Sequence, residues 1–203
     1  MPYDYSGVPP ATELELIPAG TIVEVAMKIR IPKDSGVGED GMLTRSRDGK
    51  CEMLDCELVV LNGQYANRKF WDRFILTGTT QGHADAEERS RRTLRSILDS
   101  SRGFKPNDNS PEARAARTNV SLKDFDGISF IAKVGIDKGR PKNDGTGEFW
   151  PDRNMLAAVI TPDRRDWHPP EQPVPFNGGG SDSAATTPSA PMGPGIARPD
   201  WAS

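Results

Sequence analysis

A regular alternation of apolar and polar side chains in residues 21–31 constrains the fold of this chain more than any other feature. The apolar side chains recur at every second position: Val23, Val25, Met27, Ile29 and Ile31. Charged side chains occupy most of the intervening positions: Glu24, Lys28 and Arg30. Because successive side chains of a strand point to opposite faces, the pattern predicts a first strand with one buried face.

Two later segments read as a hairpin. Residues 52–61 predict a second strand, whose inward side chains are Leu54, Cys56, Leu58 and Val60. Asn62-Gly63 follows, and both residues tolerate the positive φ of a type I′ turn. Residues 69–76 are therefore expected to form a third strand, antiparallel to the second.

The period changes to helical in residues 85–102. Leu94, Ile97 and Leu98 stand at i, i+3 and i+4, and Gly103 closes the helix. Only this narrow face is apolar, so we expect the helix to cover another element. Ser110-Pro111-Glu112 carries the N-cap and N1 signals of a second, short helix.

Two more strands follow the helices. Residues 127–137 alternate again, and their apolar positions are Ile128, Phe130, Ala132, Val134 and Ile136. Asp124-Phe125-Asp126-Gly127 reads as the turn into this strand. Residues 154–161 predict a fifth strand, which Pro162 ends. Two long polar connections, residues 32–50 and 138–152, join the first pair and the last pair of strands.

The order of three strands, a helix and two strands predicts a mainly β fold. It is typical of a five-stranded barrel of the oligonucleotide-binding (OB) type, with the helix between strands three and four. We expect residues 1–168 to form this one domain. Residues 169–203 are rich in Pro, Gly and Ser and predict a disordered tail, because they bury too little apolar surface to offset their conformational entropy.

Bulk properties exclude several classes of protein. No apolar run approaches the roughly 20 residues of a membrane helix, and the N-terminus lacks a signal peptide, so we expect a cytoplasmic protein. Cys51 and Cys56 are the two cysteines. Their odd spacing on one strand predicts opposite faces, hence buried thiols rather than a disulfide or a shared metal site.

The charge is unevenly distributed, although the whole chain carries a net charge of -3. Residues 28–50 and residues 64–77 each carry a net charge of +2, whereas both ends of the chain are acidic. Positive charge thus accumulates where the predicted barrel binds ligands, across strands two and three and between the two long connections.

Basic and aromatic residues gather on the third strand. Lys69, Trp71 and Arg73 share one of its faces, Phe70, Asp72 and Phe74 share the other, and Arg68 precedes it. Single-stranded DNA requires this combination, because aromatic rings stack on bases at about 1–3 kcal/mol each and cations follow the phosphates. The alternative is that Trp71 is a partly buried sheet residue between solubilising charges.

The two long connections carry the remaining candidates for nucleic-acid binding. Residues 138–152 contain Lys138, Arg140, Lys142, Phe149 and Trp150. Two adjacent aromatics in a Gly-rich loop favour closure on a partner or packing back onto the barrel. Residues 32–50 contribute Arg45, Arg47 and Lys50.

Catalytic patterns are weak, and we expect no enzyme activity, cofactor or metal. His83 and His168 have no partner at metal-ligand spacing. Asp55 with Glu57, or Asp124 with Asp126, would suit a divalent cation, yet no lysine stands where a metal-dependent nuclease requires one. Phosphate-cradling, dinucleotide-binding and nucleophile-elbow motifs are missing from the sequence.

Four segments resemble phage and prophage single-stranded-DNA-binding proteins. They are residues 3–7 (YDYSG), 16–21 (LIPAGT), 58–71 (LVVLNGQYANRKFW) and 126–127 (DG). The resemblance spans about residues 3–161. It implies an OB-type barrel that protects single strands during replication or recombination in the host cytoplasm. Many such proteins end in a flexible tail with an acidic tip that recruits partners. Residues 198–203 contain one acidic residue, so recruitment of partners through Trp201 is a hypothesis.

The sequence therefore favours sequence-tolerant binding of single-stranded DNA. Its alternative is a non-catalytic β-barrel module that binds a protein of a phage or replication assembly. Pairing of exposed sheet edges makes a homodimer conceivable as well.

Overall fold

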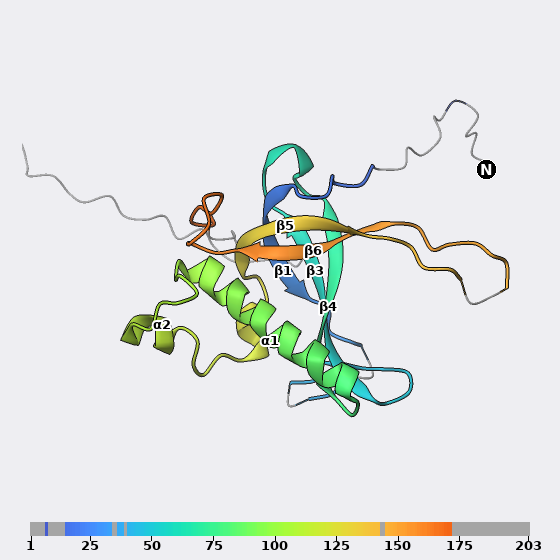
Figure 1. The fold of residues 1–203 in the computed structure, drawn as a ribbon, viewed down its shortest axis with the longest axis horizontal. Helices are drawn as coiled ribbons and strands as arrows, with labels where there is room; N and C mark the ends of the chain where they lie inside the picture. The colour runs from blue at the N-terminus through green and yellow to red at the C-terminus, as the bar shows by residue number, and fades with distance from the viewer. Residues whose placement is uncertain (1–6, 8–14, 34–35, 39, 143–144, 172–203) are drawn as a thin grey trace, which may run out of the picture.

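The structure is a computed structural model, and it describes residues 7, 15–33, 36–38, 40–142 and 145–171 (Figure 1). The strands are β1 (Ile22–Ile29), β2 (Thr44–Arg45), β3 (Cys51–Val60), β4 (Lys69–Gly78), β5 (Ser129–Asp137) and β6 (Arg153–Ile160). The helices are α1 (Gln81–Arg102) and α2 (Pro111–Ala115), with 3₁₀ turns η1 (Gly63–Tyr65) and η2 (Leu122–Phe125). The expected mainly β fold, with the main helix between the third and fourth long strands, is confirmed.

The strands form one antiparallel six-stranded sheet, which is open. Its order is β2-β3-β1-β5-β6, and β4 pairs with the other edge of β3. A closed barrel would pair β4 with β6, but no ladder joins these two strands in the described residues. One side chain spans the gap instead, since Oδ2 of Asp72 on β4 accepts a hydrogen bond of 3.2 Å from the backbone N–H of Leu156 on β6.

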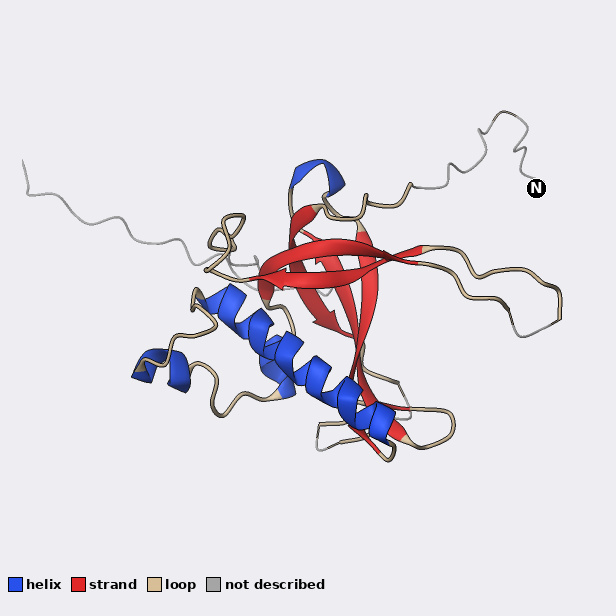
Figure 2. Cartoon of the chain, viewed as in Figure 1, coloured by secondary structure: helices blue, strands red, loops and turns tan. Residues whose placement is uncertain are grey.

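The core lies inside the curved sheet and under α1 (Figure 2). β1 places Val23, Val25, Met27 and Ile29 there, and the helix adds Leu94, Ile97 and Leu98, as their spacing predicts. Ile31 is the exception. β1 ends at Ile29, so the expectation that Ile31 faces inward is wrong, and its side chain is 57% exposed.

The connection between β3 and β4 corrects the expected tight turn. The strands pair antiparallel as expected, but residues 61–68 join them through η1, and Asn62 has φ -145° where a type I′ turn requires a positive value. Two tertiary contacts hold the wider connection. Tyr65 packs against the core, and the amide of Asn62 donates to the buried Glu24 carboxylate over 2.9 Å.

Helix α1 has the expected C-terminus and an earlier start. Gly103 ends it with φ 75°, the left-handed conformation that glycine adopts most easily. The helix begins at Gln81 because Thr80 is its N-cap, whose side chain accepts a hydrogen bond from His83 N–H. Ser110 caps α2 in the same way, as predicted.

The two cysteines of β3 agree with the sequence-based expectation. Cys51 and Cys56 are buried and free, which confirms the expected thiols. The β-bulge opposite Glu52 and Met53 inserts its extra residue, Leu76, into β4 and leaves the alternation of β3 intact. Cys56 belongs to the core cluster and Cys51 does not, in agreement with the predicted opposite faces. The long connection before β3 is also more ordered than its polar composition suggests, since it contains β2 and buries Met42 and Leu43.

Glu171, the last described residue, is held beside Glu24. The Glu171 N–H donates to Oε1 of Glu24 over 2.6 Å, and the hydroxyl of Ser129 donates to the Glu171 carbonyl over 2.9 Å. Of the predicted tail, residues 169–203, the structure describes 169–171, and residues 172–203 with Trp201 lie outside the described residues. Residues 3–6 of the resembling segments also lie outside them. Of the part that is described, no helix has the length and apolar character needed to span a membrane.

Candidate nucleic-acid interface

The candidate interface begins with the outward side chains of three neighbouring strands, here called the outer face. The register aligns β1, β3 and β4 in rows, one of which is Lys28, Glu57 and Trp71. The complete set is Ala26 and Lys28 on β1 with Arg30 directly after it, Asp55, Glu57 and Val59 on β3, and Lys69, Trp71 and Arg73 on β4. The outer face therefore joins cations, carboxylates and one tryptophan from segments far apart in the sequence.

Trp71 is the exposed apolar centre of the outer face. Its side chain is 49% exposed, whereas Phe70 and Phe74, on the opposite face of β4, are 1% and 4% exposed. The alternation along β4 is thus the one that the sequence predicts. An indole left half in water on a strand is available for stacking. The same exposure also agrees with the alternative of a partly buried sheet residue between charges, so both interpretations of Trp71 stand.

Carboxylates of the central strand neutralise the cations beside Trp71. Lys69 Nζ lies 2.8 Å from Oε1 of Glu57, and Arg73 Nε lies 2.5 Å from Oδ1 of Asp55. The two carboxylates are half-buried while the two cations are exposed. The sequence pattern suggested a cation site at Asp55 and Glu57, but these side chains make ion pairs, and the described residues contain no group of three metal-ligating side chains.

Residues 138–142 and 145–152 form a β-hairpin arm rather than an irregular loop, and we call them the arm. The Trp150 N–H donates to the Arg140 carbonyl over 2.9 Å, and the Lys142 N–H donates to the Glu148 carbonyl over 2.7 Å. The arm continues the β5–β6 ladder and reaches away from the sheet (Figure 1). It does not fold back onto the domain, so that half of the sequence-based expectation is wrong.

The arm exposes two aromatic side chains near its middle. Phe149 is 64% exposed and Trp150 is 60% exposed. Lys142 Nζ lies 5.5 Å from the centre of the Trp150 ring, within cation–π range, and 2.5 Å from Glu148 Oε2. At the base of the arm, Lys138 Nζ lies 2.6 Å from Oδ2 of Asp152. This hydrogen bond, with one from Gly139 N–H, holds the pKa of the Asp152 carboxyl below its ordinary value.

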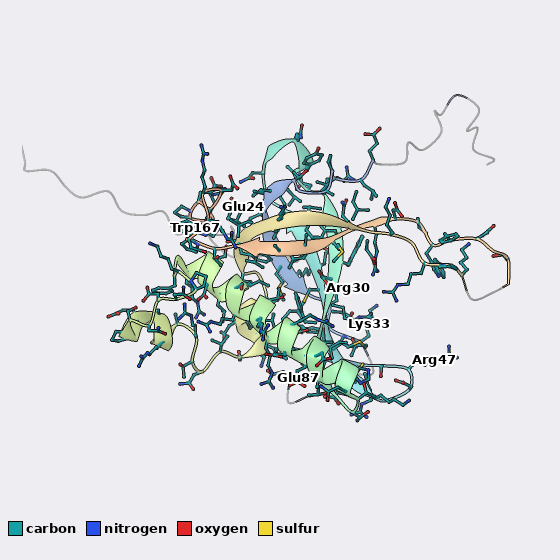
Figure 3. All side chains as sticks on the ribbon, viewed as in Figure 1. Glu24, Arg30, Lys33, Arg47, Glu87 and Trp167 are labelled. Atoms are coloured by element: carbon teal, nitrogen blue, oxygen red, sulfur yellow. The ribbon has the colours of Figure 1, made fainter. Side chains whose placement is uncertain are left out.

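The other basic candidates divide into paired and unpaired side chains. Arg45 on β2 lies 2.9 Å from Glu52, and Lys50 lies 3.7 Å from Asp48. Arg47 and Arg140 are exposed and make no ion pair to a described residue. Arg30 and Lys33 are also exposed and make no ion pair to a described residue. Figure 3 labels them together with Arg47, and neither is among the binding residues predicted from the sequence. Arg30 lies on the polar side of the first alternating segment, so its position would have identified it.

Arg68, a predicted DNA-binding residue, also makes a structural contact. Its guanidinium donates to the backbone carbonyl of Glu15 over 2.5 Å and is only partly exposed. It therefore ties the segment before β1 to the connection before β4. This contact uses one of the five N–H donors of the guanidinium, and its role in binding DNA stays a prediction.

Two polar groups beneath the outer face, the Cys56 thiol and the Asp72 carboxyl, have a structural role in the sheet. Burial raises the pKa of the Cys56 thiol far above its ordinary value, so this thiol is neutral. Burial also raises the pKa of Asp72, against hydrogen bonds from the backbone of Arg73 and Leu156. Neither group reaches the exposed surface around Trp71.

Comparison of the chain with protein-family models, with curated proteins and with solved structures gives no match. The resemblance to phage single-stranded-DNA-binding proteins thus stays a hypothesis from the sequence.

Proposed function

We propose that this protein binds single-stranded DNA across the outer face and the arm, without catalysis. The observation that carries the proposal is the exposure of Trp71, Phe149 and Trp150, on the two elements where the sequence predicts ligand binding. Trp71 lies between Lys69 and Arg73 on β4, and Trp150 lies beside Lys142. Half-exposed aromatic rings with flanking cations are the features by which proteins hold unpaired strands.

We further propose that the open sheet is an OB-type barrel that is not closed between β4 and β6. Supporting this reading, β1 lies between β3 and β5, the main helix lies between β4 and β5, and Asp72 bridges the gap to Leu156. In barrels of this type, oligonucleotides cross strands two and three, which correspond to β3 and β4 here.

Binding would combine stacking with an exchange of ion partners. A base stacks on Trp71, and phosphates take over Lys69 and Arg73 from Glu57 and Asp55. Surface ion pairs are worth about 0–1 kcal/mol, so phosphates can replace them at low cost. Arg30, Arg47 and Arg140 need no such exchange within the described residues, and counterion release from all these contacts makes affinity fall with salt.

The test is fluorescence anisotropy with a labelled dT oligonucleotide of 30 nucleotides, titrated at low and high salt beside a duplex of the same length. We expect binding of the single strand that weakens with salt, and much weaker binding of the duplex. Trp71→Ala with Trp150→Ala should weaken single-strand binding more than about tenfold, because two stacking partners are lost. Absence of binding at low salt would refute the proposal.

A matched control uses Arg91 and Arg92 of α1. They are exposed, and each is paired with a glutamate four residues before it, as Lys69 and Arg73 are paired with carboxylates. Replacing both by Ala should leave the affinity within about twofold of wild type. The small change expected comes from the loss of two positive charges. Replacing Lys69 and Arg73 by Ala should lower both the affinity and its salt dependence.

One observation favours a protein partner as the second candidate. Ion pairs leave the surroundings of Trp71 close to neutral, and neutral surfaces with exposed aromatics also suit protein interfaces. Salt separates the two functions. A protein interface centred on Trp71 would be weakly salt-dependent, and the oligonucleotide would not bind.

A further inference from the structure

The carboxylates beside Trp71 also affect which base can bind there, an inference that rests on the proposed function. Glu57 is the direct cross-strand partner of Trp71, and such partners have Cβ atoms about 4.5–5.5 Å apart. A base stacked on the indole would thus present its hydrogen-bonding edge within reach of the Glu57 carboxylate. In most single-strand binders that tolerate any sequence, base preferences come from stacking rather than from hydrogen bonds to this edge.

The Glu57 carboxylate can accept a further hydrogen bond while it is ion-paired. Lys69 Nζ contacts one of its oxygens, Oε1. An ionised carboxylate accepts at about four lone-pair sites and donates none. The side chain is held on the central strand, 18% exposed, so it stays beside the ring instead of turning away into solvent.

An acceptor that cannot donate distinguishes bases by their exocyclic groups. Cytosine presents an amino group at N4, which carboxylates accept, whereas uracil and thymine present the O4 carbonyl at that position. A carbonyl oxygen facing a carboxylate gains no hydrogen bond and meets a like partial charge. Other stacking properties of cytosine and uracil are similar, since both are pyrimidines.

We propose that Glu57 makes the Trp71 position selective for bases with an exocyclic amino group, so that cytosine is preferred to uracil or thymine. The preference concerns this one position. The exposed aromatics of the arm have no carboxylate as a direct cross-strand partner in the described ladders, so they stack without this selection.

The experiment measures the binding of dC30, dU30 and dT30 by fluorescence anisotropy and compares the affinities for dC30 and dU30. It is done at pH 8, where cytosine tracts stay unfolded. One accepted hydrogen bond predicts that wild type binds dC30 about fivefold more tightly than dU30. Glu57→Gln should bring the ratio of the two affinities close to one, because an amide both accepts and donates. Thermal melting of each variant confirms that the fold is retained.

Glu52→Gln is the matched control. Glu52 lies on the same strand and pairs with Arg45, but its register partner on β4 is Thr77, away from Trp71. Its replacement removes the same charge and should strengthen binding to both oligonucleotides without changing their ratio.

Each outcome decides one proposal. Equal binding of dC30 and dU30 by wild type, or an unchanged ratio in Glu57→Gln, would overturn the selectivity and leave single-strand binding intact. Failure of dC30, dU30 and dT30 alike to bind would overturn the proposed function itself.

Discussion

Arg73 and Asp55 face each other directly across the β3–β4 ladder, with 2.5 Å between Nε and Oδ1. A phosphate bound at Arg73 must compete with this carboxylate. We therefore expect Asp55→Asn to strengthen binding of dT30 by about fivefold, which corresponds to the energy of one nearby charge in water. Titrations at constant salt measure the change.

The control for Asp55→Asn is Asp163→Asn. Asp163 is an exposed acid after β6 that lies 3.7 Å from Arg164, so the variant makes the same change of net charge away from the outer face. Affinity should stay within about twofold of wild type. Equal strengthening by both variants would mean that only net charge matters, and weakening by Asp55→Asn would contradict the proposed exchange of partners.

A second prediction concerns the residues that hold the segment after α1. Arg117 Nε donates to the buried Asp99 carboxylate over 2.7 Å, and its other nitrogens donate to the carbonyls of Asp108 and Lys105. Among the described residues, Arg117→Ala leaves the buried carboxylate with one distant cationic partner, Arg95 at 3.8 Å. We expect a loss of about 3–5 kcal/mol in the free energy of unfolding, measured in urea.

Arg92→Ala provides the comparison for Arg117. Arg92 is also ion-paired on α1, but it is highly exposed, so its removal should cost less than about 0.5 kcal/mol. Similar losses in the two variants would show that burial of the Arg117 pair contributes nothing. DNA binding by Arg117→Ala should stay normal below its unfolding midpoint, since the pair lies away from the outer face.

A third prediction concerns the arm, where the backbones of Gly139 and Trp150 lie close together. A Cβ built on Gly139 would lie 1.5 Å from the carbonyl oxygen of Trp150, so Gly139→Ala must separate the two strands of the arm. We expect about fivefold weaker binding of dT30, because Trp150 loses its fixed position. Anisotropy measures binding, and the melting temperature should be nearly unchanged since the arm lies outside the core.

Gly82→Ala serves as the neutral glycine replacement. Gly82 lies in the first turn of α1, where an added Cβ would meet no atom closer than 4.0 Å. Binding and stability should both be close to wild type, with at most a small gain from helix propensity. Normal binding by Gly139→Ala would contradict a role for the ordered arm.

Local signals explain which parts of the fold could be predicted. The period of two in β1 and the helical spacing of Leu94, Ile97 and Leu98 arise from burial of one face, and the caps Ser110 and Gly103 act within one turn. These predictions needed no knowledge of distant contacts. The outward face of Lys69, Trp71 and Arg73 followed from the same alternation.

The features that the sequence did not reveal depend on tertiary contacts. Asn62 lacks the expected turn conformation because its amide binds Glu24, 38 residues earlier. The β-bulge that leaves Leu76 unpaired opposite Glu52 and Met53 depends on the pairing of β3 with β4, and so does the partnership of Glu57 with Trp71. Register decides which charges meet, and a sequence pattern fixes the face of a side chain but not its neighbour on the next strand.

The last prediction concerns Asp72, which joins β4 to β6. Burial raises the pKa of its carboxyl in the folded protein above the ordinary value of 3.8. The folded state therefore binds the Asp72 proton more tightly than the unfolded state. The contribution of this group to stability is greatest below pH 3.8 and declines as the pH rises through the folded pKa, so ionised Asp72 disfavours the fold at neutral pH.

Asp72→Asn cannot ionise, and its stability relative to wild type should therefore improve steadily from pH 4 to pH 7, whatever constant offset the altered hydrogen bonds to Arg73 and Leu156 introduce. Urea unfolding at four pH values measures this difference. Asp152→Asn gives the opposite sign, because hydrogen bonds from Lys138 and Gly139 lower the pKa of Asp152. The variant should lose stability relative to wild type as the pH rises from the lowered folded pKa to above 3.8, and the difference should be constant at higher pH. A difference for Asp72→Asn that is constant with pH, or that moves in the direction of Asp152→Asn, would contradict the burial of an ionisable group in the gap between β4 and β6.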